Sequence, residues 1–120
     1  MLNSAVFAEN SAVFISFSMP EKLLIETLQE SARLQILAVL NGLVDNSFEK
    51  TVQKVTVLTK EIPNLQLQID PTQFERFNIK KVPALVVENN QCFDVVYGNL
   101  PLHAGLLRIH EKGECVRHAS

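Results

Sequence analysis

The sequence predicts a single α/β domain with a mixed sheet of four to five strands. Between Ala12 and Leu40 a buried-type strand, an amphipathic helix and a second short apolar run form a βαβ pattern. Two later apolar runs flank Asn89-Asn90, residues of the type that close an antiparallel hairpin. The 120 residues, 47% hydrophobic and 20% charged, suit one domain with a sizeable core.

The net charge and the lengths of the apolar runs argue against nucleic-acid binding and against a membrane-spanning helix. Eleven basic and thirteen acidic residues give a net charge of -2, which provides no electrostatic footprint for nucleic acid. No apolar run approaches the roughly 20 residues that a membrane-spanning helix needs.

Residues 1–11 lack the basic and apolar regions of a secretory signal, so the chain is either cytosolic or a domain cut from a longer exported protein. We expect a disordered or extended segment over 1–11, the domain over 12–113 and a tail over 114–120.

The first strand leads directly into the first helix. Ala12–Phe17 carries β-branched and aromatic residues and is too short for a helix, which predicts a strand covered on both faces. Ser18 and Glu21 have the spacing of a capping box, and Pro20 falls in the first turn of a helix over Met19–Arg33. The junction should therefore lie at the carboxyl edge of the sheet, where α/β folds usually keep their sites.

A second parallel strand and a second helix follow. Ile36–Leu40 is the next apolar run, joined to the first by a right-handed crossover. Asn46 with Glu49 three positions on predicts the cap of a helix that Pro63 ends. The residues with helical spacing, expected on the buried face, are Phe48, Val52, Val55 and Ile62.

The second half of the chain predicts an edge strand, a short helix and a hairpin. Apolar and polar residues alternate over Leu65–Ile69, which indicates a half-exposed strand. Asp70-Pro71 then opens a helical turn that buries Phe74 and Phe77. Ala84–Val87 and Phe93–Tyr97 are the hairpin strands. A last helix, from Pro101 to Gly113, places Leu102, Leu106 and Ile109 in register.

This order of elements resembles the thioredoxin fold. The most telling stretch runs from Ile69-Asp70, through Phe74 and Phe77, to Val82-Pro83-Ala84. In thioredoxin-like proteins this stretch leads into a cis-proline, so the resemblance implies a cis bond before Pro83. It also implies a three-layer α/β/α arrangement.

Several blocks, spread from Val13 to Cys115, resemble the TrbC pilin-assembly family of F-type conjugative transfer systems. The blocks are Phe17-Ser18-Met19-Pro20, Gly42-Leu43-Val44, Asn46-Ser47-Phe48, Gln68-Ile69-Asp70-Pro71-Thr72, Val82-Pro83-Ala84 and Asp94-Val95-Val96-Tyr97-Gly98-Asn99. The resemblance implies a periplasmic component of a type IV secretion apparatus that works with the partner protein TraW. That family carries a signal and an extra segment before this domain, which favours an excised domain here.

The first helix lacks the chemistry of a redox-active thioredoxin. Active members place Cys-x-x-Cys at the helix start, where the helix N-terminus lowers the thiol pKa. Here the positions are Ser18-Met19-Pro20-Glu21, so composition excludes disulfide exchange at this site. Ser18 has no neighbouring base in sequence, and we expect it to cap the helix rather than act as a nucleophile. No catalytic residue is predicted.

Cys92 and Cys115 should lie at the same end of the domain, away from Ser18. The strand after Cys92 rises roughly 17 to 20 Å, and the last helix returns about 18 Å. A structural disulfide, two free thiols in a cytosolic protein and a redox-active pair all remain open on this geometry. The resemblance to a periplasmic family favours the disulfide, which would contribute roughly 3 kcal/mol.

No metal site or cofactor is predicted. His103 and His110 are seven residues apart, about 10 Å along a helix, whereas a shared metal favours a spacing of four. Cys115 with His118 supplies only half a ligand set.

The remaining candidate site is a protein-binding groove at the strand-to-helix junction. In thioredoxin-like proteins, backbone beside the cis-proline pairs with an extended peptide. Met19, Leu43 and Leu100 would add apolar contact, and Lys80 and Lys81 a positive rim. The alternative is that these are ordinary turn residues without a partner. The full predicted groove is Ser18, Met19, Pro20, Leu43, Lys81, Val82, Pro83 and Leu100.

Three functional hypotheses follow. The leading one is a redox-inactive, thioredoxin-like protein-binding module in conjugative pilus assembly, working with a TraW-like partner in the periplasm. The second is a periplasmic thiol-disulfide oxidoreductase or isomerase that uses Cys92 and Cys115. The third is a cytosolic adaptor of the same fold with two free thiols. No oligomeric state follows from the sequence.

Overall fold

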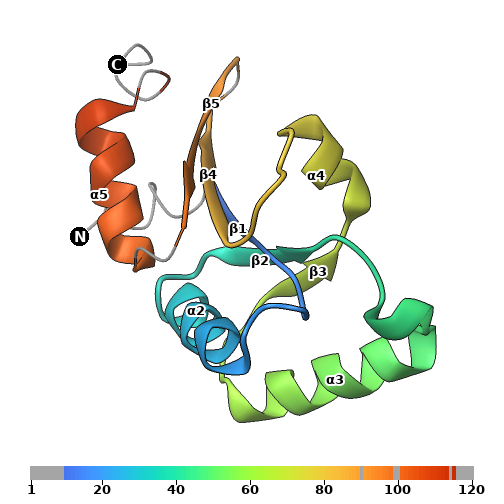
Figure 1. Ribbon diagram of the computed structural model, residues 1–120. Helices are drawn as coiled ribbons and strands as arrows, with labels where there is room; N and C mark the ends of the chain where they lie inside the picture. The colour runs from blue at the N-terminus through green and yellow to red at the C-terminus, as the bar shows by residue number, and fades with distance from the viewer. Residues whose placement is uncertain (1–9, 90, 99–100, 114, 116–120) are drawn as a thin grey trace.

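A mixed sheet of five strands runs through the centre of the molecule (Figure 1). The computed structural model describes residues 10–89, 91–98, 101–113 and 115. The strands are β1 (Ser11–Ile15), β2 (Leu37–Leu40), β3 (Leu67–Ile69), β4 (Ala84–Glu88) and β5 (Phe93–Tyr97). Their order is β3-β2-β1-β4-β5, with β1, β2 and β3 parallel and the β4–β5 hairpin joined antiparallel to β1. The predicted mixed sheet and the edge position of β3 are confirmed.

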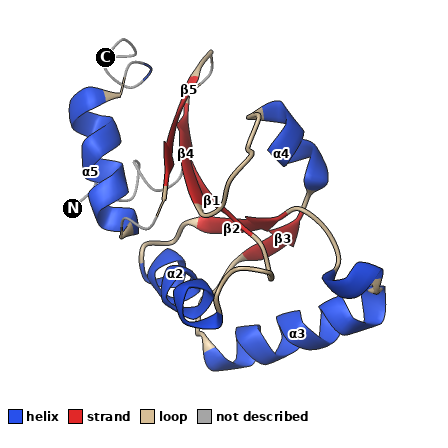
Figure 2. Cartoon of the chain, in the orientation of Figure 1, coloured by secondary structure: helices blue, strands red, loops and turns tan. Residues whose placement is uncertain are grey.

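Helices cover both faces of the sheet (Figure 2). They are α2 (Glu21–Arg33), α3 (Phe48–Glu61), α4 (Pro71–Arg76) and α5 (Leu102–Lys112), with a short 3-10 turn, η1 (Val44–Asn46), before α3. Val13 and Ile15 of β1 point into a core shared with α2, α3 and α5, while Phe14 points into a second core under α4. Because all three side chains are fully buried, β1 is covered on both faces, as the apolar run predicts.

The second core is small and aromatic. The ring of Phe14 meets Phe74 edge to face with centroids 4.9 Å apart, and Phe77 at 5.8 Å. Asp70 caps α4 by accepting a hydrogen bond from the Thr72 N–H. The prediction that Asp70-Pro71 opens a helix burying both phenylalanines is confirmed.

Both ends of β1 differ from the prediction. β1 ends at Ile15 instead of Phe17, because the Met19 N–H donates to the Ser16 carbonyl at 3.2 Å and closes a turn there. β1 also begins at Ser11, and the Asn10 carbonyl accepts from the Glu88 N–H, so the extended strand starts one residue before the expected domain boundary at residue 12. Residues 1–9 of the expected N-terminal segment lie outside the described part of the chain, and so does the expected tail over 114–120 except for Cys115.

The predicted buried face of α3 is partly wrong. Phe48 and Val52 are 71% and 44% exposed, whereas Thr51 is fully buried and Leu58 nearly so. α3 contacts the core mainly through its C-terminal half, where Leu58 and Ile62 belong to the first core. The apolar residues that share helical spacing in the sequence therefore do not all lie on the face of α3 that contacts the core. Those at the start of α3 are exposed to solvent.

The structure contains the cis peptide bond between Val82 and Pro83 that the resemblance to the thioredoxin fold implies. The thioredoxin-like assignment itself stays a prediction beyond the observed three-layer α/β architecture. No helix in the described ranges has the length and apolar character to cross a membrane.

Candidate functional site

The turn after β1 is closed by its own serines. The Ser18 N–H donates to the Ser16 hydroxyl at 3.1 Å, and the two hydroxyl oxygens lie 2.7 Å apart. Pro20, with ψ 136°, holds the N-cap position of α2, and no side chain among the described residues caps this helix. The predicted capping box of Ser18 and Glu21 is therefore wrong, since the turn through Met19 moves the helix start beyond the reach of Ser18.

Met19 lies beneath this turn rather than on it. Its side chain is 8% exposed and belongs to the first core, and its sulfur accepts a hydrogen bond from the Ser16 N–H at 3.5 Å. Ser18 and Pro20 are exposed on either side of it in the sequence. Of the three predicted groove residues at this turn, Met19 therefore offers almost no accessible surface.

The loop after β2 lies beside the turn after β1. A depression of about 430 Å³ is lined by Ser16–Ser18 from the first segment and Leu40–Asp45 from the second. The loop is fixed to α3 because the buried Thr51 hydroxyl accepts from the Val44 N–H and donates to the Ser47 carbonyl, each at 2.7 Å. We name this hollow the β1–β2 depression.

The N-cap of α3 lies one residue later than predicted. The Ser47 hydroxyl accepts from the Lys50 N–H, so Ser47 is the N-cap. Asn46 instead has φ of 57°, a left-handed conformation that asparagine tolerates in turns. Leu43 on the loop is 40% exposed and gives the β1–β2 depression an apolar rim, and Phe48 and Val52 of α3 are exposed as well.

The segment before β4 lies beside the ends of β1 and β5. Pro83 is buried, and its carbonyl accepts from the Gly98 N–H at 3.1 Å. Val82 is half-buried and touches both cores, while Lys80 and Lys81 are exposed. No backbone hydrogen bond from another described residue reaches the N–H or the carbonyl of Val82.

The predicted groove residues divide between two hollows. Ser18 and Leu43 line the β1–β2 depression, whereas Pro83 lines a second hollow of about 430 Å³ between α2 and the start of α5. Pro20, Lys81 and Val82 line neither of these two. Leu100 and the rest of its turn lie outside the described residues.

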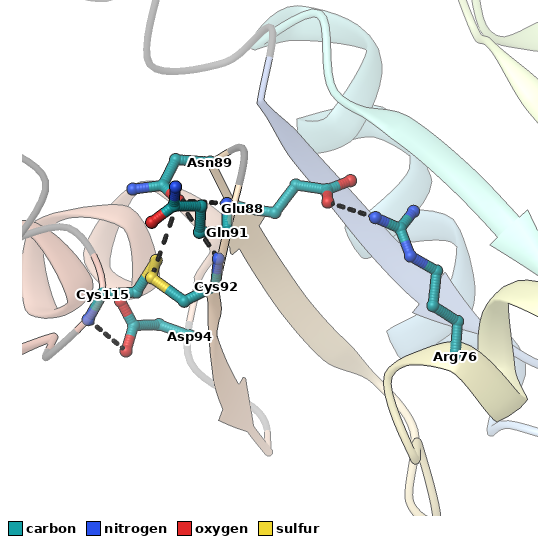
Figure 3. Close-up of a disulfide and its surroundings, with 7 residues drawn as sticks. All are labelled: Arg76, Glu88, Asn89, Gln91, Cys92, Asp94 and Cys115. Atoms are coloured by element: carbon teal, nitrogen blue, oxygen red, sulfur yellow. Dashed lines mark hydrogen bonds and ion pairs between the residues drawn. A yellow bond between two sulfur atoms is a disulfide. The ribbon is translucent and has the colours of Figure 1, made fainter.

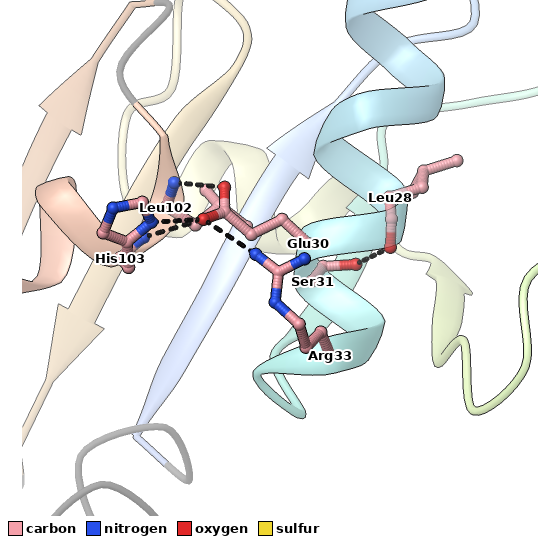
Figure 4. A network of polar contacts seen from close by, with 6 residues as sticks. All are labelled: Leu28, Glu30, Ser31, Arg33, Leu102 and His103. Atoms are coloured by element: carbon pink, nitrogen blue, oxygen red, sulfur yellow. Dashed lines mark hydrogen bonds and ion pairs between the residues drawn. The ribbon is translucent and has the colours of Figure 1, made fainter.

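The second hollow contains a polar network that the sequence analysis missed. The Glu30 carboxylate, 8% exposed as a residue, accepts from the backbone N–H groups of Leu102 and His103 and lies 2.7 Å from His103 Nδ1 (Figure 4). Arg33 is a weaker partner at 3.5 Å. Burial raises the pKa of Glu30, but the hydrogen bonds from His103 and Leu102 outweigh it, so the pKa lies below its ordinary value.

One signal in the sequence pointed to this network. α5 starts at Pro101-Leu102 without a Ser, Thr, Asp or Asn that could cap it. Its first N–H groups therefore need an acceptor from elsewhere, and Glu30 lies on the buried side of α2. His103 is an exposed residue, and its ring joins α5 to α2 through the Glu30 carboxylate.

The two cysteines form a disulfide at the far end of the hairpin (Figure 3). Cys92 precedes β5 and Cys115 follows α5, with Cα atoms 5.6 Å apart. The Asp94 carboxylate accepts from the Cys115 N–H at 3.3 Å, which ties the same two elements a second time. The pairing favoured by the family resemblance is present, and the alternative of two free thiols is not.

No group of three or more metal-ligating side chains occurs in the described part of the chain.

Comparison with known proteins gives one family and one curated relative. The sequence model of the family described as "Type-F conjugative transfer system pilin assembly protein" matches residues 13–108. The chain is 37% identical over 107 residues to "Periplasmic protein TrbC" of Escherichia coli strain K12. The aligned part is 89% of this chain and 50% of the relative, so the chain spans about half the length of the relative it matches. No solved structure gives a significant match.

Proposed function

Because the chain belongs to the family of type-F conjugative transfer system pilin assembly proteins, we propose that it acts in pilus assembly as a periplasmic protein-binding module. In this proposal the domain binds a TraW-like assembly protein and performs no redox chemistry. The matched region, residues 13–108, covers β1 through most of α5, so the family relationship extends to the described fold rather than to one motif.

The observation that carries the proposal is the chemistry of the β1–α2 junction. This position holds Ser18-Met19-Pro20-Glu21, which contains no thiol, and the Ser18 hydroxyl is paired with Ser16. Both cysteines of the chain are joined to each other beside the β4–β5 turn, and Cys115 is 5% exposed. Cys92 of the same bridge is exposed, but the bridge joins the β4–β5 hairpin to the end of α5 and does not lie at the β1–α2 junction, which supports a structural bridge over a catalytic pair.

The proposed binding face combines an open backbone with an apolar rim. Val82 offers backbone groups for strand addition, and Lys81 supplies positive charge beside it. Leu43 and Phe48 supply exposed apolar surface on the loop and helix that follow β2. The proposed contact residues are Ser18, Pro20, Leu43, Lys81, Val82 and Pro83, with Leu100 as a further candidate and Met19 supporting them from below.

Calorimetric titration with a purified TraW-like protein tests this proposal. We expect saturable binding by the intact chain, and binding should persist in a Cys92→Ser/Cys115→Ser variant wherever that variant remains folded. Absence of binding by the intact, folded chain would contradict the proposal that this region carries the assembly contact.

An insulin-reduction assay tests the competing oxidoreductase hypothesis. We expect no turnover above the uncatalysed rate. Appreciable turnover that disappears in the Cys92→Ser variant would replace the binding module with a thiol-disulfide oxidoreductase.

A further inference from the structure

One edge of the sheet is a five-residue strand with open backbone groups. The Asn89 N–H donates to the Cys92 carbonyl at 2.9 Å, and the Gly98 N–H to the Pro83 carbonyl at 3.1 Å. Bonded pairs alternate along an antiparallel ladder, so the backbone groups of Phe93, Val95 and Tyr97 point away from β4. No hydrogen bond from another described residue reaches those outer backbone groups.

This edge lacks the features that keep sheet edges unpaired. Exposed edges are usually blunted by shortness, proline, bulges or charged side chains. β3, at the opposite edge, is only three residues long and is followed by Asp70-Pro71. At β5 the outward-pointing positions are Phe93, Val95 and Tyr97, none of them charged and none a proline.

The side chains of the same three positions form an apolar row on the α4 face. Phe93 and Tyr97 are each 42% exposed. The Phe93 ring meets Phe77 with centroids 4.8 Å apart, and the Tyr97 hydroxyl donates to the Asn78 carbonyl at 3.4 Å. The disulfide and the Asp94–Cys115 hydrogen bond fix the hairpin from the other face (Figure 3). The strand is therefore ordered before any partner arrives, which lowers the entropy lost on pairing.

We propose that β5 pairs antiparallel with β5 of a second copy of this chain, centred on Val95. This pairing is independent of the proposed function and uses a different surface. In this register Val95 opposes Val95 of the second copy, and Phe93 opposes its Tyr97 in both directions. Cross-strand aromatic pairs stabilise sheets, so the strand is complementary to itself under a two-fold axis.

Charge selects the same register. Asp94 is the only charged residue in β5, and pairing centred on Val95 places it opposite Val96 of the second copy. A register centred on Asp94 would place two carboxylates directly opposite each other, which is destabilising. The net charge of -2 opposes association of two copies only weakly.

The expected dimer is weak, because a ladder of five residues buries less than a standard interface of roughly 1,200 to 2,000 Å². Sedimentation velocity of the full chain, at concentrations from about 5 to about 500 µM, should show the mass rising from 13.5 kDa toward twice that value. Tyr97→Lys should raise the dissociation constant of the dimer at least tenfold. Ile69→Lys is the matched control, since Ile69 is 37% exposed on the other edge strand. Thermal unfolding of both variants checks that they are folded.

Cysteine cross-linking tests the register independently of stability. Val95→Cys should form a covalent dimer under oxidised glutathione, which accepts the two electrons and two protons of the new disulfide. Directly opposed Cα atoms lie about 5.5 Å apart, within disulfide range. Tyr97→Cys should cross-link poorly, because those positions would be four residues apart, about 13 Å. A monomer over the whole concentration range, a dimer unaffected by Tyr97→Lys, or equal cross-linking of the two variants would overturn the proposal.

Discussion

The carboxylate of Glu30 on α2 lies 2.7 Å from Nδ1 of His103 on α5, joining two helices whose contact residues are 73 positions apart in the chain. The same carboxylate accepts the otherwise uncapped N–H groups of Leu102 and His103. The Glu30 side chain of α2 therefore caps the N-terminus of α5, and it fixes the start of α5 beside Pro83.

Replacing Glu30 by glutamine should lower the free energy of unfolding at neutral pH by about 1.5 to 3 kcal/mol, the range for hydrogen bonds to a charged group. Glu26→Gln, on an exposed position of the same helix, is the control and should change little. Urea unfolding of the three proteins measures the difference. Equal stability of the Glu30→Gln variant and the wild type would show that the network is not stabilising.

The same network predicts a dependence of stability on pH. Hydrogen bonds hold the pKa of Glu30 in the folded protein below its ordinary value of 4.5, so the unfolded chain binds more protons as the pH falls through that region. The stabilisation is complete above the unfolded pKa and is lost as the pH falls through the folded pKa. Unfolding curves of the wild type and Glu30→Gln should therefore differ most at neutral pH and converge in acid. A constant difference across this range would contradict the assignment.

The sequence predicted the sheet well because its strands are short apolar runs bounded by turn residues. The βαβ unit, the edge strand β3 and the antiparallel hairpin all follow from local patterns in the chain. The Glu30 network could not be predicted in the same way, since its acceptor and its donors lie more than 70 residues apart. Periodicity reports one element at a time and does not identify which elements become neighbours.

The errors at helix starts have a different physical cause. Ser18 and Asn46 have suitable side chains for capping, but the cap is decided by the backbone of the preceding turn. Pro20 occupies the N-cap position of α2, and Asn46 adopts a positive φ, so neither predicted cap forms. Of the predicted groove residues, Ser18 and Leu43 line the same depression, while the burial of Met19 depends on packing that no local pattern reports.

The disulfide should contribute about 3 kcal/mol to stability, as expected for a bridge that closes a loop of 23 residues' separation. The Cys92→Ser/Cys115→Ser variant should lose this amount in urea unfolding, because its unfolded chain is less restricted. Wild-type protein held in reductant is the matched control and should unfold at the same urea concentration as the variant. A variant as stable as the oxidised wild type would exclude a structural role for the bridge.

Thr51 should be more important to the β2–α3 connection than its size suggests. Thr51→Val keeps the shape of the side chain but leaves the Val44 N–H without its acceptor, which should cost about 1 to 3 kcal/mol. Thr56→Val is the control on the same helix, since Thr56 is exposed and donates only to the Val52 carbonyl. Chemical denaturation compares the two. A larger loss for Thr56→Val would show that helix propensity, not the loop contact, dominates.

Met19→Asp should destabilise the fold instead of acting as a surface change. The side chain is in the first core, so a carboxylate there would lose its hydration without a partner, at a cost of about 3 kcal/mol or more. Met19→Leu conserves volume and should cost less than about 1.5 kcal/mol. Thermal unfolding distinguishes them, and a fully stable Met19→Asp variant would indicate that Met19 is accessible after all.

Leu43→Glu should separate partner binding from stability. Leu43 is 40% exposed at the rim of the β1–β2 depression, so the substitution should leave the unfolding transition within about 0.5 kcal/mol of wild type. If a TraW-like partner docks on this rim, its affinity should fall at least about tenfold, the loss expected for an interface residue of moderate weight. Val57→Glu is the matched control, since Val57 is 52% exposed on α3 and lies outside the lining of the depression. Equal affinities of the two variants, measured by calorimetry, would move the interface away from the β1–β2 depression.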